Sequence, residues 1–335
     1  MRPSTNGRRA LLASGAVLPL LPAASAAQRT AEPAAGAWPS RPIRFVVPFA
    51  AGGNSDVTAR LFAEQIGPRL GQPVVVENRS GATGAIGTEA VIRSKPDGYT
   101  LLIGSPGSIV NGPLLMAAPR YDPIAELTPV ALLGQVPMAI TVRPEIPVRN
   151  LGELVAHSKA RPGGVTIGTS GVGGANHLPL ELFKAATGAN LVHVPYRGGG
   201  NTLPDFVAGN VDGVLIELAS VLDLHRDGRG RILGVAAPQR SPAAPDIPTI
   251  AEQGLSEFEA TSWFALFAPA GTPKDIVAKW NAELKRIFAL PDVAAKLQTV
   301  GLDAMLSSPE DLAAFQEREI RKWTKVVKDS GAKAE

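Results

Sequence analysis

Two glycine-containing segments are the part of the sequence best suited to hold a small anion. They span residues 51–56 and 169–174, and each lies between an apolar run and a segment with helical periodicity. The unpaired N–H groups at the start of a helix carry about half a positive charge and can replace the water around a carboxylate. Asn54 and Asp56 are also residue types that simply cap helices. The residues of these loops that we expect at the ligand are Ala51, Gly52, Gly53, Asn54, Asp56, Thr169, Ser170, Gly171 and Gly173.

Five further side chains could face a ligand, although most have a structural alternative. Arg197 could hold a carboxylate through two parallel hydrogen bonds, or it could brace its own domain. Tyr196 and Phe49 could line a cleft or fill the core, where large aromatic side chains are common. His177 lies just inside an expected helix, where a structural role is common, and Ser105 follows an expected strand. We include all five in the predicted ligand site.

Sequence motifs for catalysis, cofactors and metals are missing. Gly168–Val172 lacks the second glycine of the GxSxG nucleophile motif. Gly171–Asn176 lacks the last glycine of GxGxxG, and the chain has no Gly-Lys pair for a phosphate-binding loop. The four histidines do not have HExxH spacing, and there are no cysteines. The sequence therefore predicts no catalytic residue, no cofactor and no metal site.

The N-terminal segment is typical of an export signal. Residues 1–9 are basic, residues 10–21 are almost wholly apolar, and Ala24-Ser25-Ala26 provides a cleavage pattern of small residues. We predict a signal peptide over residues 1–27, used by the twin-arginine or the general secretory route, and a linker over residues 28–40. Cleavage would remove three arginines and no acid, which leaves 30 basic and 30 acidic residues. The mature protein is then neutral, and a nucleic-acid partner is not expected.

The rest of the 335-residue chain alternates short apolar strands with helices, as α/β proteins do. The expected strands lie at residues 43–48, 74–76, 99–103, 165–167, 191–194, 211–216, 231–236 and 262–268. The expected helices lie at residues 54–70, 89–94, 151–159, 175–187, 200–208 and 272–288, and a last one begins after Ser308. We expect crossovers between two domains near residues 130–142 and 262–268. The predicted lobes are residues 41–137 with 263–335, and residues 138–262, joined by a two-segment hinge.

Six ordered segments resemble the Bug (TctC-like) family of extracytoplasmic solute receptors. They are residues 48–60, 77–87, 96–100, 170–178, 193–199 and 267–273, which together span most of the mature chain. The resemblance implies a two-lobed periplasmic binding fold, type II-like, that closes over a small carboxylate. It also implies a tripartite tricarboxylate transporter as the membrane partner. Ile216 departs from the family, which often has an aspartate or a small residue there beside the expected pocket, so we add Ile216 to the predicted site.

The function predicted from these features is a periplasmic receptor that captures a small organic carboxylate. The ligand could be a di- or tricarboxylate, an amino acid or an aromatic acid, and we expect the receptor to be a monomer. One alternative is a sensor subunit that uses the same closure to signal through a membrane kinase. Another is a secreted hydrolase, which the missing catalytic motifs make the weakest of the three.

Overall fold

The computed structural model describes residues 38–196, 199–256, 258–299 and 301–333. The predicted signal peptide and most of the predicted linker lie outside the described residues, as does Arg197. Residues 39–335 form one unit, to which all the described helices and strands belong. No helix among the described residues is long and apolar enough to cross a membrane.

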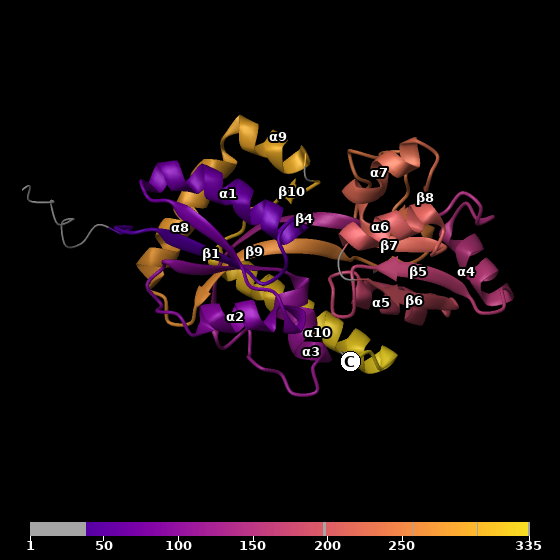
Figure 1. Cartoon of the computed structure of the whole chain (residues 1–335), viewed down its shortest axis with the longest axis horizontal. Helices are drawn as coiled ribbons and strands as arrows, with labels where there is room; N and C mark the ends of the chain where they lie inside the picture. Colours follow the sequence, from indigo (N-terminus) through magenta and orange to yellow (C-terminus); the bar gives the residue numbers. More distant parts are fainter. Residues whose placement is uncertain (1–37, 197–198, 257, 300, 334–335) are drawn as a thin grey trace, which may run out of the picture. The chain divides into compact units, whose positions relative to one another are not determined.

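The first half of the fold is a mixed sheet with helices on both faces (Figure 1). Its strands run in the order β2-β1-β3-β9-β4, with β1, β2 and β3 parallel and β9 antiparallel to both β3 and β4. Helices α1 and α8 cover one face, and α2 and α10 cover the other. The strands are β1 (Ile43–Val47), β2 (Val74–Asn78), β3 (Thr100–Gly104), β4 (Leu127–Val142), β9 (Thr261–Pro269) and the short β10 (Asp303–Ala304). The helices are α1 (Asn54–Leu70), α2 (Ala85–Ile92), α3 (Gly112–Leu115), α8 (Lys274–Phe288), α9 (Pro291–Thr299) and α10 (Pro309–Ser330).

The second half is a smaller sheet built on the end of β4. Strand β7 pairs antiparallel with β4 and parallel with β5, which pairs parallel with β6, while β8 also pairs with β4. The strands are β5 (Val165–Thr169), β6 (Leu191–Pro195), β7 (Gly213–Glu217) and β8 (Arg231–Val235). The helices are α4 (Leu151–Ala160), α5 (His177–Thr187), α6 (Gly199–Ala208) and α7 (Leu218–Arg226).

Strand β4 changes partner where the two halves meet. Its first part, through Pro137, pairs with β9, and its last part, from Met138, pairs with β7. The chain returns through β9, whose first residue Thr261 lies opposite Pro137. Two adjacent segments therefore connect the halves. Helix α10 lies along the first half and also contacts α5 of the second (Figure 1).

Most expected elements are present, and the exceptions have local causes. Ser308 caps α10 by accepting a 3.0 Å hydrogen bond from the Asp311 N–H, with Pro309 in the first turn, as the sequence predicts. Helix α2 begins earlier than expected, directly after the positive-φ Gly84. The structure also contains helix α7, which the sequence does not predict because only two of its nine residues, Leu218 and Val221, are buried.

Candidate functional site

The carboxyl ends of parallel strands bring the predicted loops to two facing edges. In the first half, β1 and β3 end at the segments that begin with Pro48 and Ser105. In the second half, β5 and β7 are parallel neighbours and end at Thr169 and Glu217. Ligands of open α/β sheets bind in the crevice outside such strand ends.

The first loop is held by the buried carboxylate of Asp56. One oxygen accepts a 2.9 Å hydrogen bond from the Gly52 N–H, and the other accepts a 3.0 Å bond from the Asn78 amide. Arg60, one turn along α1, forms a 2.9 Å ion pair with the same group. Burial alone would raise the pKa of Asp56, but the bonds from Arg60, Gly52 and Asn78 outweigh it and hold the pKa below its ordinary value. Asp56 therefore shapes the loop rather than reaching into the crevice.

At the start of α1, some backbone N–H groups have no hydrogen-bond partner among the described residues. The first intrahelical bonds of α1 are made by the N–H groups of Asp56 and Val57, which both donate to the Gly53 carbonyl. The N–H groups of Gly53, Asn54 and Ser55 precede those bonds, as at any helix start. Gly53 is the N-cap residue and provides no side-chain cap. These three donors fit the predicted anion site better than Gly52, whose N–H is already occupied by Asp56.

The second loop satisfies several of its own donors, which differs from the prediction. The Ser170 N–H and hydroxyl both donate to the Asn176 side-chain oxygen, over 3.1 and 2.7 Å. The Gly171 N–H donates to the Thr169 hydroxyl over 3.3 Å, and the Gly173 N–H donates to His177 Nδ1 over 3.3 Å. Buried N–H groups must find a partner, and here nearby side chains provide it. A ligand would have to replace these bonds to use the same donors.

Two stacked histidines form hydrogen bonds with the second loop. The rings of His177 and His193 are 4.6 Å apart and nearly parallel, and His193 Nε2 lies 2.6 Å from the Thr169 hydroxyl. Burial lowers the pKa of both rings, that of His193 to about 4, so both are neutral at pH 7. Neutral rings can take part in the loop's hydrogen bonds as acceptors. The pair connects Thr169 to Gly173 and fixes the loop's conformation.

Glu181 lies beside this pair, and the three side chains have ligand atoms within 4.8 Å of one another. Such a set could in principle hold a metal ion. However, Nδ1 of His177 accepts the Gly173 N–H, so the neutral ring carries its proton on Nε2, where it blocks metal ligation. Glu181 is also paired with Lys184 at 2.8 Å. The geometry fits a loop support better than a metal centre.

The second loop reaches the first half of the sheet. The side-chain amide of Asn111 donates to the carbonyl oxygens of Gly173 and Gly174, over 3.3 and 2.8 Å. A Cβ on Gly173, which has a φ of 73°, would lie only 2.5 Å from the Thr83 methyl group, so glycine is required for this approach. The Phe49 ring lies beside this contact, against Gly107. The second predicted loop thus contacts the first half at Asn111 and Thr83, outside the first predicted loop.

A second contact between the halves involves a carboxyl group that the sequence analysis missed. Glu217, the last residue of β7, interacts with the side chain of Asn54 in the first turn of α1. Burial raises the pKa of Glu217 above its ordinary value, against the opposing effects of its own backbone N–H and of Asn54. No ion pair of the described residues includes Glu217, although its side chain keeps partial exposure.

The comparison with known proteins identifies the family. A model described as the tripartite tricarboxylate transporter family receptor matches residues 58–332. The chain belongs to this receptor family. Members of the family are transporter receptors and not enzymes, in agreement with the missing catalytic motifs.

Three solved structures resemble this receptor over nearly their whole length. Rpa4515 of R. palustris, solved with adipate, is 36% identical with a TM-score of 0.81, over 88% of this chain and 99% of its own. MatC from Rhodopseudomonas palustris, with bound malate, is 33% identical with a TM-score of 0.78, over 87% and 100%. The periplasmic binding protein BugD is 34% identical with a TM-score of 0.78, over 89% and 100%. The α/β periplasmic-binding-protein fold is thereby confirmed.

Two predicted residues of the receptor pack into its second half. Tyr196 donates its hydroxyl to Asp205 over 2.9 Å, and burial together with this acid raises the pKa of Tyr196 to about 12. Asp205 of α6 is therefore the hydrogen-bond partner of a tyrosine. Ile216 is 1% exposed and lies in a hydrophobic cluster with Phe206, so it contacts core residues and does not face the crevice.

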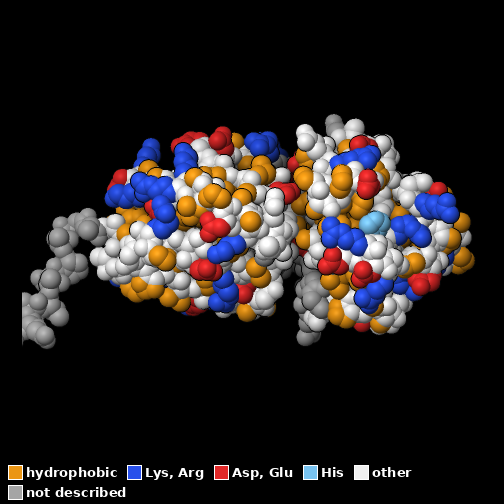
Figure 2. Space-filling view, turned by 90° about the horizontal axis from the view of Figure 1, so that it is seen from above, with side chains coloured by type: hydrophobic (Ala, Val, Ile, Leu, Met, Phe, Trp, Pro, Cys, Tyr) orange, Lys and Arg blue, Asp and Glu red, His pale blue; other side chains and the backbone are white. Residues whose placement is uncertain are grey.

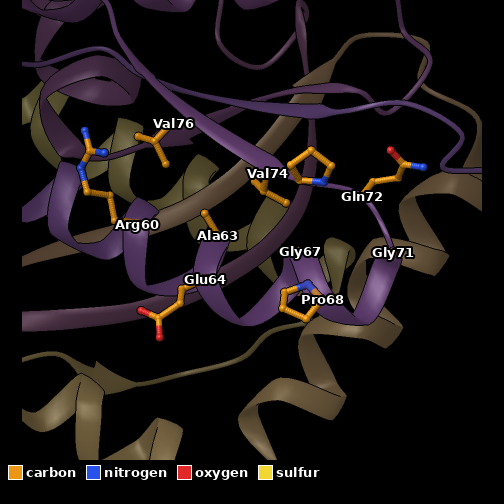
Figure 3. Close-up of a pocket in the computed structure, with 10 residues that line it drawn as sticks. Arg60, Ala63, Glu64, Gly67, Pro68, Gly71, Gln72, Val74 and Val76 are labelled. Atoms are coloured by element: carbon orange, nitrogen blue, oxygen red, sulfur yellow. The ribbon is translucent and has the colours of Figure 1, made fainter.

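The receptor's surface also has a groove away from the predicted site. A groove of about 650 Å³ lies between α1 and the edge strand β2, with Arg60, Glu64 and Gln72 among its lining (Figure 3). None of the predicted loop residues lines it. In the space-filling view, acidic and basic side chains are interspersed and a furrow runs between the two halves (Figure 2).

Proposed function

We propose that this receptor captures a small organic carboxylate between its two halves and delivers it to the membrane subunits of a tripartite tricarboxylate transporter. The observation that carries the proposal is a contact between the two halves, in which Asn111 of the first half donates to the Gly173 and Gly174 carbonyls of the second loop. A contact of this kind forms only when the halves are close together, so a ligand that bridges them stabilises the closed form.

The donors at the start of α1 are the proposed carboxylate site. The N–H groups of Gly53, Asn54 and Ser55 have no partner within α1, and a carboxylate placed there would accept several hydrogen bonds at once. The adipate in Rpa4515 and the malate in MatC support this class of ligand. Phe49, Ser105, Thr169 and Ser170 would complete the surroundings of the ligand, and Arg197 remains a proposed contact.

Closure would use the two connections between the halves. We propose residues 41–137 with 263–335 as one lobe and residues 138–262 as the other. The change of partner along β4 at Pro137 and Met138, opposite Thr261 on β9, supports a hinge at this point.

We also propose that a signal peptide over residues 1–27 directs the protein to the periplasm, where it acts as a monomer.

Native mass spectrometry of protein isolated from periplasm, followed by thermal-shift titration, tests the proposal. The panel consists of mono-, di- and tricarboxylates, amino acids and aromatic acids. We expect a co-purifying acid that raises the melting temperature as its concentration increases, because it binds the folded state alone. If no acid in the panel binds, the carboxylate assignment is wrong. Recovery of a membrane kinase and no transporter subunit in a pull-down would instead overturn the transport assignment.

A further inference from the structure

Glu217 stands where the two halves meet, at the end of the proposed ligand crevice. It is the last residue of β7, and its Cα partner on β4 is Met138, the first residue of β4 beyond its pairing with β9. Strand β5, parallel to β7, ends nearby at Thr169 and opens the second loop. Glu217 therefore shares a sheet edge with that loop and faces the first turn of α1 in the other half.

Among the residues that the structure describes, the carboxyl group of Glu217 bonds to its own backbone N–H and to Asn54 and forms no ion pair. Glu217 occupies the N-cap position of α7 but makes no side-chain cap. Within the part of the chain that the structure describes, its side-chain partner is Asn54, a neutral amide from the other half. By contrast, Asp56, the acid in the first turn of α1, is compensated by its ion pair with Arg60. A partly exposed carboxyl group that has no cationic partner among the described residues thus lies beside the first turn of α1.

The position of Asn54 limits which group of a ligand would meet Glu217. Asn54 is in the first turn of α1, whose free N–H groups are the proposed carboxylate site. Burial raises the pKa of Glu217, so a second carboxylate of the ligand beside it would oppose its ionised form further, whereas a cation would favour that form. A protonated amine on the carbon next to the bound carboxylate would instead supply the missing cation within reach of Glu217.

We propose that Glu217 recognises the ammonium group of an α-amino acid whose carboxylate binds at the start of α1. This inference rests on the proposed function and narrows its ligand class to carboxylates that carry an amine. Glu217 is then a specificity-determining residue, because it favours the zwitterion and disfavours the same acid without the amine. Acids that carry a hydroxyl in place of the amine would bind with intermediate affinity.

Calorimetric titration with matched ligand pairs tests the inference. The pairs share a carbon skeleton and differ by the α-amine: succinate and aspartate, glutarate and glutamate, adipate and 2-aminoadipate, butyrate and 2-aminobutyrate. For at least one pair we expect the wild-type receptor to bind the amine-bearing member at least tenfold more tightly. Glu217→Gln keeps the shape and the hydrogen bond to Asn54 but removes the charge, and should reduce this preference to less than threefold. Asp223→Asn is the matched control, because Asp223 is a fully solvated acid of α7 whose side chain is 89% exposed.

The outcomes separate this inference from the proposed function. A wild-type receptor that binds the plain acids as tightly as their amine-bearing partners overturns the role of Glu217 and leaves carboxylate capture intact. An unchanged preference in Glu217→Gln, with the variant folded by circular dichroism, also overturns it. If no member of any pair binds, and the wider acid panel also fails, the proposed function is wrong and the inference falls with it.

Discussion

The side-chain amide of Asn111 lies 2.8 Å from the carbonyl oxygen of Gly174 and connects the two halves of the sheet. Asn111 comes directly before α3 in the first half, and Gly174 belongs to the loop before α5 in the second. Asn111 is 1% exposed, so its two bonds to this loop are shielded from water. These bonds exist only while the two halves are together, and they favour the closed arrangement.

Asn111→Ala should therefore weaken ligand binding more than it weakens the fold of either half. The change removes two hydrogen bonds that stabilise closure, which are together worth about 1–3 kcal/mol. We expect the dissociation constant of the ligand to rise about tenfold or more. The measurement is calorimetric titration with the acid identified from the panel.

Asn281→Ala is the matched control for this prediction. Asn281 is also a buried asparagine that donates to two carbonyl oxygens, but these belong to Val130 and Ser307 within the first half. Its loss should lower the melting temperature and leave affinity within twofold. Equal effects of the two variants on affinity would show that Asn111 has no special role in closure.

Gly53→Pro tests the backbone donors at the start of α1. Proline removes the Gly53 N–H, and the φ of −81° at this position is close to the range that proline requires. We expect a folded protein whose affinity for the acid falls at least tenfold. Gly53→Ala keeps the N–H and meets only the Ala50 carbonyl oxygen at 3.7 Å, so it should bind almost as the wild type does.

Gly171 would be a poor site for the same test. Its φ is 128°, which proline cannot adopt, and a Cβ there would lie 2.5 Å from the Tyr196 carbonyl oxygen. A loss of binding in Gly171→Pro would therefore reflect a distorted loop rather than a missing donor.

Comparable affinities of Gly53→Pro and Gly53→Ala would contradict the assignment of the α1 donors.

The positions of the loops could be predicted from the sequence, but their internal bonding could not. Short apolar runs followed by glycine and cap residues indicate a strand, a loop and a helix, because these local patterns restrict the backbone directly. Whether a loop N–H is free depends on side chains that only the fold brings near. His177 reaches back to Gly173, and Asp56 reaches back to Gly52.

The residues that connect the two halves had no local signal. Asn111 lies in an apolar stretch, and Glu217 ends an apolar strand, so neither belongs to a motif. Their roles come from the meeting of segments more than sixty residues apart, such as Asn111 and Gly174. Ile216, beside Glu217, is expected at the site by resemblance, yet strand alternation turns its side chain into the core.

Asp56→Ala should destabilise the protein by about 2 kcal/mol or more. The change leaves the Gly52 N–H and the Asn78 amide without their acceptor and removes the partner of Arg60. Chemical denaturation measures the loss. Asp275→Ala is the control, since Asp275 forms a solvated pair with Lys279 one turn away on α8 and should contribute less than about 0.5 kcal/mol. Similar losses in both variants would mean that Asp56 does not organise the loop.

His193 should make the receptor less stable as the pH falls from about 6.5 to about 4. The folded protein holds the pKa of His193 near 4, mainly by burial, whereas an unfolded chain has the ordinary value of 6.5. Protons then bind preferentially to the unfolded state between these two values, and stability declines with decreasing pH throughout that interval. Above pH 6.5 the ring is neutral in both states, so His193 contributes no pH dependence there.

The size of the effect follows from the separation of the two pKa values. By about pH 4 the loss of stability caused by His193 amounts to about 3 kcal/mol, because the ring is then protonated in the unfolded chain and much less so in the folded protein. Denaturation of wild-type protein and of His193→Gln at pH 7, 5.5 and 4 isolates this contribution, because glutamine can still bond to Thr169 but does not titrate. The wild type should lose more stability than the variant over this range. If the stability of the two proteins changed equally with pH, His193 would be protonated as easily in the folded receptor as in the unfolded chain. The assignment of a neutral, stacked histidine pair would then be wrong.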